Sequence, residues 1–145
     1  MPDKIFDLDQ LTVNFIVDGA PIDGSAGLVI DGDFLKIAKE TAEETKTRKG
    51  TKGESYTVLS VEDNIRNVEI SYLPGSSMIP VLQAIRQNKK SFGLAITNNS
   101  SPKYKFFAPS CTIADEPETV VNGKDGFKDY MFKIRCSDSD QIWSE

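Results

Sequence analysis

The residue types that could do chemistry are few in this chain, and one of them is missing altogether. The 145 residues include no histidine. Histidine is the commonest general base and zinc ligand, and most Ser and Cys nucleophiles depend on it. Aspartate and glutamate are plentiful, but no spacing among them singles out a catalytic pair. The sequence therefore predicts a protein that is not an enzyme, with no catalytic residue.

The two cysteines are the next candidates. If residues 104–114 and 126–136 form a hairpin that turns near 122–125, Cys111 and Cys136 lie opposite each other. A disulfide is then geometrically feasible. The alternative is a pair of small apolar thiols kept reduced in the cytosol. Two cysteines without histidine make a poor metal site, so we expect neither a metal nor a cofactor.

Short acidic and amide-rich segments resemble ligand or modification sites only in part. Residues 18–23 and 31–33 have calcium-like acidic character, but they lack the further ligands and distal glutamate of an EF-hand loop. Turn formation explains them better. Residues 98–101 match glycosylation acceptor sequences, which carry little weight without a signal peptide.

Charge is distributed unevenly along the chain. The segment 45–53 carries cations and no acid, whereas residues 1–33 carry seven aspartates and one lysine. Such segments could complement each other between identical subunits stacked head to tail. Phosphate binding and a simply solvated loop are the alternatives. The net charge of −5 argues against a free-standing nucleic-acid binder. The cations are Lys46, Arg48, Lys49 and Lys52.

Hydrophobic periodicity predicts mainly strands and one helix. Ile79, Leu82 and Ile85 share one face of a helix expected at about 77–89. Strands are expected where apolar and polar residues alternate or where the chain returns after a turn. The expected strands are 11–18, 20–23, 34–40, 55–60, 66–73, 92–98, 104–114 and 126–136.

The segment 34–47 is ambiguous because it also contains good helix formers. No apolar residue follows Ala42, so a helix there would bury almost nothing. We therefore expect a strand at 34–40 and a long protruding loop or hairpin at about 40–54, with 55–60 returning.

These elements predict one domain, 1–145, with an N-terminal arm at 1–10 and a C-terminal tail at 137–145. The expected fold class is an antiparallel β-sandwich or barrel with one flanking helix. No apolar run approaches the ~20 residues that span a bilayer, and no secretory signal is evident. We expect a protein made in the cytoplasm that does not bind membranes.

The order of motifs resembles the tail tube proteins of contractile-tailed bacteriophages, which are related to tubes of type VI secretion and other injection machines. The strongest likeness lies in VEISYLPGSSMIPVLQAIRQ, in FFAPSCTIADEP and in the final strand, GFKDYMFKIRCSD. The resemblance covers most of the chain. The helix formers at 40–49 depart from some members, which leaves the shape of the stacking hairpin open.

The resemblance implies a virion structural protein. Six subunits would form a ring, their sheets would join edge to edge around a lumen, and stacked rings would make a hollow tube. The implied partners are further copies of the chain, the tail sheath protein, and baseplate or initiator and tape measure proteins. DNA would pass through without specific binding, along an acidic lumen. Assembly would take place in the host cytoplasm.

Within this hypothesis three surfaces have expected roles. Lys46, Arg48, Lys49 and Lys52 would stack rings, and Asn67, Glu69 and Ser71 would face the lumen. The outward helix residues Gln83, Arg86 and Lys90 would face the sheath. The alternative from another class is a monomeric β-sandwich that binds a ligand or carbohydrate. Such modules use exposed aromatic platforms, and the single tryptophan, Trp143, falls in the expected tail.

Overall fold

The computed structural model describes residues 6–30, 32–39, 45–59 and 65–144. The elements within these ranges are η1 (Leu8–Gln10), β1 (Leu11–Val17), β2 (Ala20–Asp23), β3 (Leu35–Lys39), β4 (Thr45–Lys49), β5 (Ser55–Leu59), β6 (Arg66–Tyr72), α1 (Met78–Gln87), β7 (Phe92–Asn98), β8 (Lys103–Asp115), β9 (Val121–Asn122), β10 (Gly126–Phe127), β11 (Tyr130–Ser137) and β12 (Asp140–Ser144).

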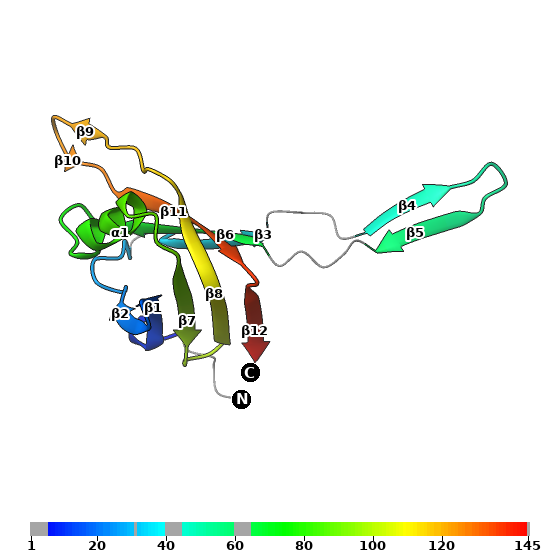
Figure 1. Cartoon of the computed structure of the whole chain (residues 1–145), viewed down its shortest axis with the longest axis horizontal. Coiled ribbons are helices and arrows are strands. Elements are labelled where there is room, and N and C mark those ends of the chain that lie inside the picture. Colours follow the sequence, from blue (N-terminus) through cyan, green and yellow to red (C-terminus); the bar gives the residue numbers. More distant parts are fainter. Residues whose placement is uncertain (1–5, 31, 40–44, 60–64, 145) are drawn as a thin grey trace.

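An antiparallel sheet of eight strands forms the body of the molecule. Seven strands follow the order β2-β1-β7-β8-β11-β6-β3, and β12 pairs with the first half of β8. The sheet bends strongly, so that β7 and β8 run across the direction of β6 and β3 in Figure 1. In the described part of the chain β2 and β3 end the path without pairing with each other. The fold is therefore mainly β and antiparallel, with one helix, and the sheet is not a closed barrel.

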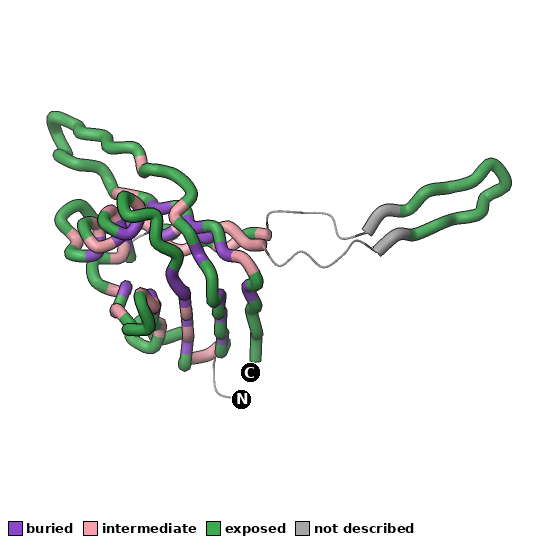
Figure 2. Tube along the Cα trace, viewed as in Figure 1, coloured by how far each residue is buried: buried purple, intermediate pink, exposed green. Residues whose placement is uncertain are grey.

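Alternation along the strands builds the core inside this bend. On β6, Val68, Ile70 and Tyr72 are buried, while the residues between them are only half-buried. Phe15 of β1 and Phe132 of β11 are fully buried as well. Burial is concentrated in the sheet and the helix, whereas the β4–β5 and β9–β10 hairpins are exposed (Figure 2). The hydrophobic effect thus stabilises the body and leaves both hairpins outside it.

Helix α1 covers the core with Met78, Leu82 and Ile85. It is shorter than the predicted 77–89. Its N-cap residue, Ser77, makes no side-chain cap, but the hydroxyl of the preceding Ser76 accepts a hydrogen bond from the Met78 amide at 3.2 Å. Pro80 sits in the first turn, where the missing amide costs no intrahelical bond. The sequence prediction of the helix is confirmed apart from its ends.

The protruding segment is a hairpin, and its strands pair differently from the prediction. β5 pairs with β4, not with the strand at 35–39, which instead pairs with β6. The reason is that Leu35 and Ile37 have apolar partners on β6, whereas 45–49 is polar throughout. The connections at 40–44 and 60–64 lie outside the described residues.

The end of the chain also differs from the prediction. The expected tail contains β12, which pairs with β8 and brings the Trp143 ring to 4.5 Å from that of Tyr104. The expected strand at 126–136 is divided into β10 and β11, because β10 pairs with β9 in a separate small hairpin. β12 was not predicted because all five of its residues are exposed, so no alternation of buried and exposed positions marks it in the sequence.

Candidate assembly surfaces

The β4–β5 hairpin is shaped by its own sequence. Its strands pair over five residue pairs. At the tip, the Gly50 amide donates to the Glu54 carbonyl at 2.7 Å, and the Lys52 amide donates to the Glu54 carboxylate at 2.9 Å. Gly53 has φ +89°, in the left-handed region that favours glycine. The hairpin stands well clear of the sheet (Figure 1).

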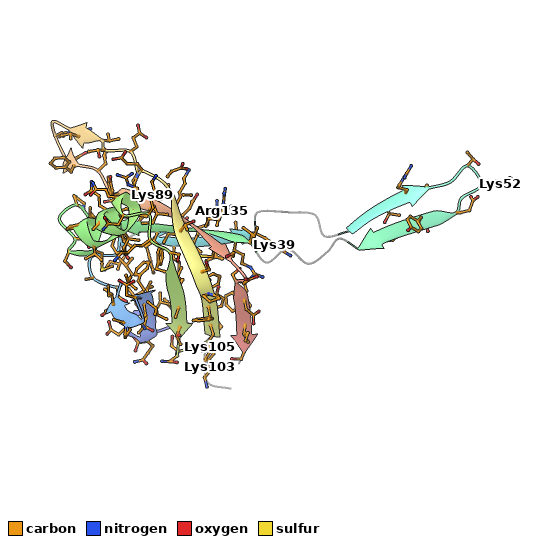
Figure 3. All side chains as sticks on the ribbon, viewed as in Figure 1. Lys39, Lys52, Lys89, Lys103, Lys105 and Arg135 are labelled. Carbon is orange, nitrogen blue, oxygen red and sulfur yellow. The ribbon has the colours of Figure 1, made fainter. Side chains whose placement is uncertain are left out.

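The predicted stacking residues lie on this hairpin. Arg48, Lys49 and Lys52 are exposed, and Lys52 lies at the tip (Figure 3). Lys46 is in β4, but its side chain lies outside the described residues. Tyr56 stands opposite Arg48 and is 69% exposed. Among the described side chains, no ion pair neutralises Arg48, Lys49 or Lys52, so the hairpin presents a basic surface with one aromatic ring.

An acidic groove of about 510 Å³ lies where β8 ends and β11 begins. It was not predicted as a site, although the acidic composition of 115–125 was a signal for it. The end of β8 and the start of β11 lie on the left in Figure 1, and the tip of the β4–β5 hairpin lies at the far right. The groove is lined by the carboxylates of Asp115, Glu116, Glu118 and Asp129, by Lys133, and by Pro117, Val120 and Met131.

The residues predicted to face a lumen share one face of β6. Asn67, Glu69 and Ser71 are half-buried and lie on the side of the sheet away from the core. In register with Glu69 are Lys36 on β3 and Lys133 on β11. The structure therefore brings the three residues together, as alternation predicted, but places cations on both sides of the single acid.

The same outer face carries more cations than acids in the part of the chain that the structure describes. Asp115 and Asp140 lie on this face as well, because they pair with the outward-facing residues Lys133 and Phe107. An acidic channel wall would therefore require carboxylates beyond those that register places on this face. The cations on this face are Lys36, Lys103, Lys105, Lys133 and Arg135; the acids are Asp23, which pairs with Asn14, Glu69, Asp115 and Asp140.

The helix residues predicted to face a sheath are partly engaged within the chain. An Arg86 nitrogen lies 3.4 Å from a Glu116 oxygen, and Lys90 Nζ lies 3.1 Å from an Asp18 oxygen. Gln83 is half-buried and borders a shallow apolar groove with Phe127. Arg86 and Lys90 are therefore already paired within the chain, and Lys90 lies beyond the end of α1 at Gln87.

A second apolar groove, of about 340 Å³, opens at the end of the sandwich. Trp143 borders it and is 64% exposed, and its ring is tilted by 51° against that of Tyr104. The Tyr104 hydroxyl donates to Gln141 at 2.8 Å, and burial raises its pKa to about 12 although Arg66 opposes the shift. The remaining apolar lining comes from Phe6, Leu11, Leu35, Ile37 and Pro102.

Metal binding and membrane spanning were considered for the described residues. These contain no cluster of three or more Cys, Asp or Glu side chains placed to hold a metal ion. Asp31, from the calcium-like segment, lies outside them. Within the same ranges, no helix combines the length and the apolar character needed to cross a membrane.

Comparison with known proteins gave matches at the level of structure alone. No protein-family model matches the sequence, and no curated protein sequence matches it. A chain in the six-fold symmetrised cryo-EM structure of the anti-feeding prophage baseplate has TM-score 0.60 at 13% identity, covering 98% of this chain and 96% of the other.

Two further solved structures are similar. A chain of the cap that terminates the anti-feeding prophage tube has TM-score 0.57 at 10% identity, covering 99% of this chain and 95% of that one. Hcp1 from Salmonella typhimurium has TM-score 0.45 at 13% identity, over 92% and 87% of the two chains. At such identities a likeness establishes architecture. The chain therefore has the fold that is found in the baseplate and the tube cap of the anti-feeding prophage.

Proposed function

We propose that this chain is the structural subunit of a tail tube, forming six-membered rings that stack into a hollow conduit for DNA. The observation that carries the proposal is the full-length structural likeness to chains of the anti-feeding prophage baseplate and tube cap. A passive conduit needs no catalytic group, which agrees with a chain that lacks histidine. The role is non-enzymatic, and its location is a tail-like particle or virion assembled in the host cytoplasm.

Open strand edges supply the means to close a ring. β2, β3 and β12 each pair on one side only within the described part of the chain. Unpaired edges template association with other strands, and monomeric proteins usually block them. Ring closure would satisfy these edges with the edges of neighbouring copies. We propose that edge pairing makes the ring and that side chains on the protruding hairpin make the stack.

The acidic groove is the surface that we propose for the hairpin of the next ring. Arg48, Lys49 and Lys52 are exposed cations, and Glu118 and Asp129 are exposed acids in the groove. Because hairpin and groove differ, the contact is heterologous and repeats along an axis instead of closing on itself. Complementary charge would set the register of one ring on the next.

The outer face of the sheet remains our proposal for the lumen wall, with Asn67, Glu69 and Ser71 on it. In register, Glu69 stands between two lysines, so the wall would be charged in alternation. Alternating charge limits the attraction of any one site for phosphate. On the outside of the tube, Gln83, Arg86 and Lys90 would meet the sheath. Baseplate, initiator and tape measure proteins would contact the ends and the lumen of the tube.

Microscopy of variants tests the stacking role. We expect the wild-type chain to form rings and tubes in negative stain. Reversing Lys46, Arg48 and Lys49 to Glu should leave rings intact and stop tube growth, because the groove would then repel the hairpin. A control reverses Lys89, Lys103 and Lys105, which are also exposed and lie away from the hairpin (Figure 3). Lys103 and Lys105 lie on the proposed lumen wall, where added acid does not bear on the contact between rings. Tubes of normal length from the hairpin variant would refute the role of the hairpin.

The carbohydrate-binding alternative has one observation in its favour. Trp143 is held in β12 beside an apolar groove, and it is not in a loose tail. Exposed aromatic rings in such positions can stack on sugar rings. Titration of the chain with oligosaccharides, followed by tryptophan fluorescence, tests this directly. A monomer that binds a sugar at micromolar concentration would replace the tube proposal.

A further inference from the structure

The buried cysteine pair has no part in the function proposed above. Cys111 on β8 and Cys136 on β11 are direct partners in strand register. Their sulfur atoms lie 3.0 Å apart, and the side chains are 1% and 0% exposed. In this structure both are thiols. Register alone has placed them, because each strand alternates inward and outward residues and both cysteines fall on the inward face.

From this geometry we infer that Cys111 and Cys136 form an intrachain disulfide when the chain meets an oxidising environment. Directly opposed residues on antiparallel strands have Cβ atoms about 4.5–5.5 Å apart, and a small rotation of the strands brings them within disulfide reach. The bond would close a loop between residues that are 25 positions apart. It needs no movement of other elements, so the folded chain holds the two sulfur atoms at a high effective concentration.

The bond would link the two strands, β8 and β11, at which the two halves of the sheet meet. In the strand order, β8 ends the half made of β2, β1, β7 and β8, and β11 begins the half made of β11, β6 and β3. These halves meet where 110–115 of β8 pair with 133–137 of β11, and the register shifts within this short contact. If neighbouring subunits pull on the end strands β2 and β3, the force passes through the pairing between β8 and β11. The disulfide would prevent the two halves from separating there.

The chemistry is a thiol–disulfide exchange with a small-molecule disulfide such as oxidised glutathione. One cysteine thiolate attacks a glutathione sulfur and releases one glutathione thiol, which leaves a mixed disulfide on the protein. The second cysteine attacks the protein-bound sulfur and releases the second glutathione thiol. Two electrons pass from the dithiol to the small disulfide, and the two cysteine protons end on the released thiols.

Burial also determines when the reaction takes place. The hydrogen bond from Cys111 to Cys136 and burial raise the pKa of the Cys111 thiol, so little thiolate is present in the folded chain. The chain therefore stays reduced in a cytosol with reducing glutathione. Oxidation proceeds during folding, or through local opening of the sheet, and is slow in the closed fold.

Refolding in defined glutathione buffers tests the inference. The full chain is unfolded, refolded with oxidised or with reduced glutathione, alkylated and analysed by mass spectrometry without reductant. We expect no alkylated cysteine and no bound glutathione after oxidative refolding, and two alkylated cysteines after reductive refolding. The oxidised form should unfold at a temperature higher by about 10 °C. The same mass spectrum should show the mass of a single chain, since an interchain disulfide would double it.

Single alanine variants serve as matched controls. Cys111→Ala and Cys136→Ala each keep one thiol, which cannot form the intrachain bond and should be recovered after oxidative refolding as one alkylated or one glutathionylated cysteine. Two free or two glutathionylated cysteines in the oxidatively refolded wild type would overturn the inference, as would an interchain product. If the wild type fails to refold, slow oxidation of the native chain, followed by the same alkylation, gives the same decision. None of these outcomes depends on ring or tube formation.

Discussion

At the scale of single residues, Gly24 joins β2, the core and β6. Its carbonyl accepts a hydrogen bond from the Tyr72 hydroxyl at 2.7 Å, and its amide donates to the Val13 carbonyl at 2.7 Å. The Phe15 ring lies so close that an added Cβ would overlap it. Glycine is needed here for space, since its backbone dihedrals are not in the left-handed region.

Gly24→Ala should therefore destabilise the fold by about 2 kcal/mol or more, because Phe15 is fully buried and cannot move away without disturbing the core. Guanidinium unfolding measures the loss. Gly123→Ala is the control, since nothing lies within 4 Å of its Cβ position. Equal midpoints for the two variants would contradict this account of the core.

The buried tyrosines make stability sensitive to alkaline pH. Burial raises the pKa of Tyr104 to about 12, and burial together with Asp23 raises that of Tyr72 further. In the unfolded chain both titrate near pH 10. Above about pH 10 the unfolded chain binds fewer protons than the folded chain, so stability falls as pH rises towards 12.

Denaturant midpoints measured at intervals from about pH 8 to 12 should show this fall. Tyr104→Phe loses the hydrogen bond to Gln141 at every pH, but its midpoint should decline less steeply above pH 10. Parallel curves for the variant and the wild type would show that Tyr104 does not contribute to the alkaline loss.

At the scale of elements, the β4–β5 hairpin is separable from the rest of the fold. Its described residues from 47 to 57 are exposed, and side-chain hydrogen bonds such as that between Thr47 and Thr57 at 3.1 Å lie within it. An isolated two-stranded hairpin is at best marginally stable in water. The element therefore adds little to the stability of the body, which suits a surface used for contact between molecules.

Replacement of residues 45–59 by a short Gly/Ser linker tests this separation. The unfolding temperature should change by less than about 5 °C, because none of the described core residues is removed. Circular dichroism and calorimetry give the measurement, and microscopy of the same sample should show rings without tubes. A large drop in unfolding temperature would mean that the hairpin packs on the body, and its role would have to be revised.

At the scale of the whole molecule, the proposed stack depends on charges at its two ends. A reciprocal exchange tests whether hairpin and groove meet. Glu118→Lys with Asp129→Lys should block growth of an otherwise wild-type tube and should restore growth when combined with the reversed hairpin. Growth of the wild-type tube should slow with added salt, since exposed charges are screened within about 10 Å at 0.1 M.

Tube length by microscopy and light scattering provide the readout. Glu116 is left unchanged in this exchange because it pairs with Arg86. Failure of the double exchange to restore growth, while each single set blocks it, would place the hairpin on a different surface. The tube proposal itself would stand in that case, because it depends on the fold and on rings.

Local pattern was enough to predict much of the fold. Alternation along 66–72, 92–98 and 104–114 and the 3.6-residue stripe of 79, 82 and 85 predicted strands and helix close to the observed ones. Register on two predicted strands was also enough to place Cys111 opposite Cys136. These features depend on residues near in sequence, whose side chains determine which face is buried.

Pairing between distant segments was decided only by the tertiary structure. The polar segment 45–49 has no apolar face to direct it, so it pairs with 55–59, while Leu35 and Ile37 lie beside β6. β12 is exposed along its length, and only the edge of β8 and the Tyr104 ring give it a place. The acidic groove draws on residues from both sides of the β9–β10 hairpin. The sequence by itself determined the elements and their buried faces, because these follow from local periodicity. The tertiary structure decided the partners of polar strands and the neighbours of each charge, because these depend on where the bent sheet brings remote residues together.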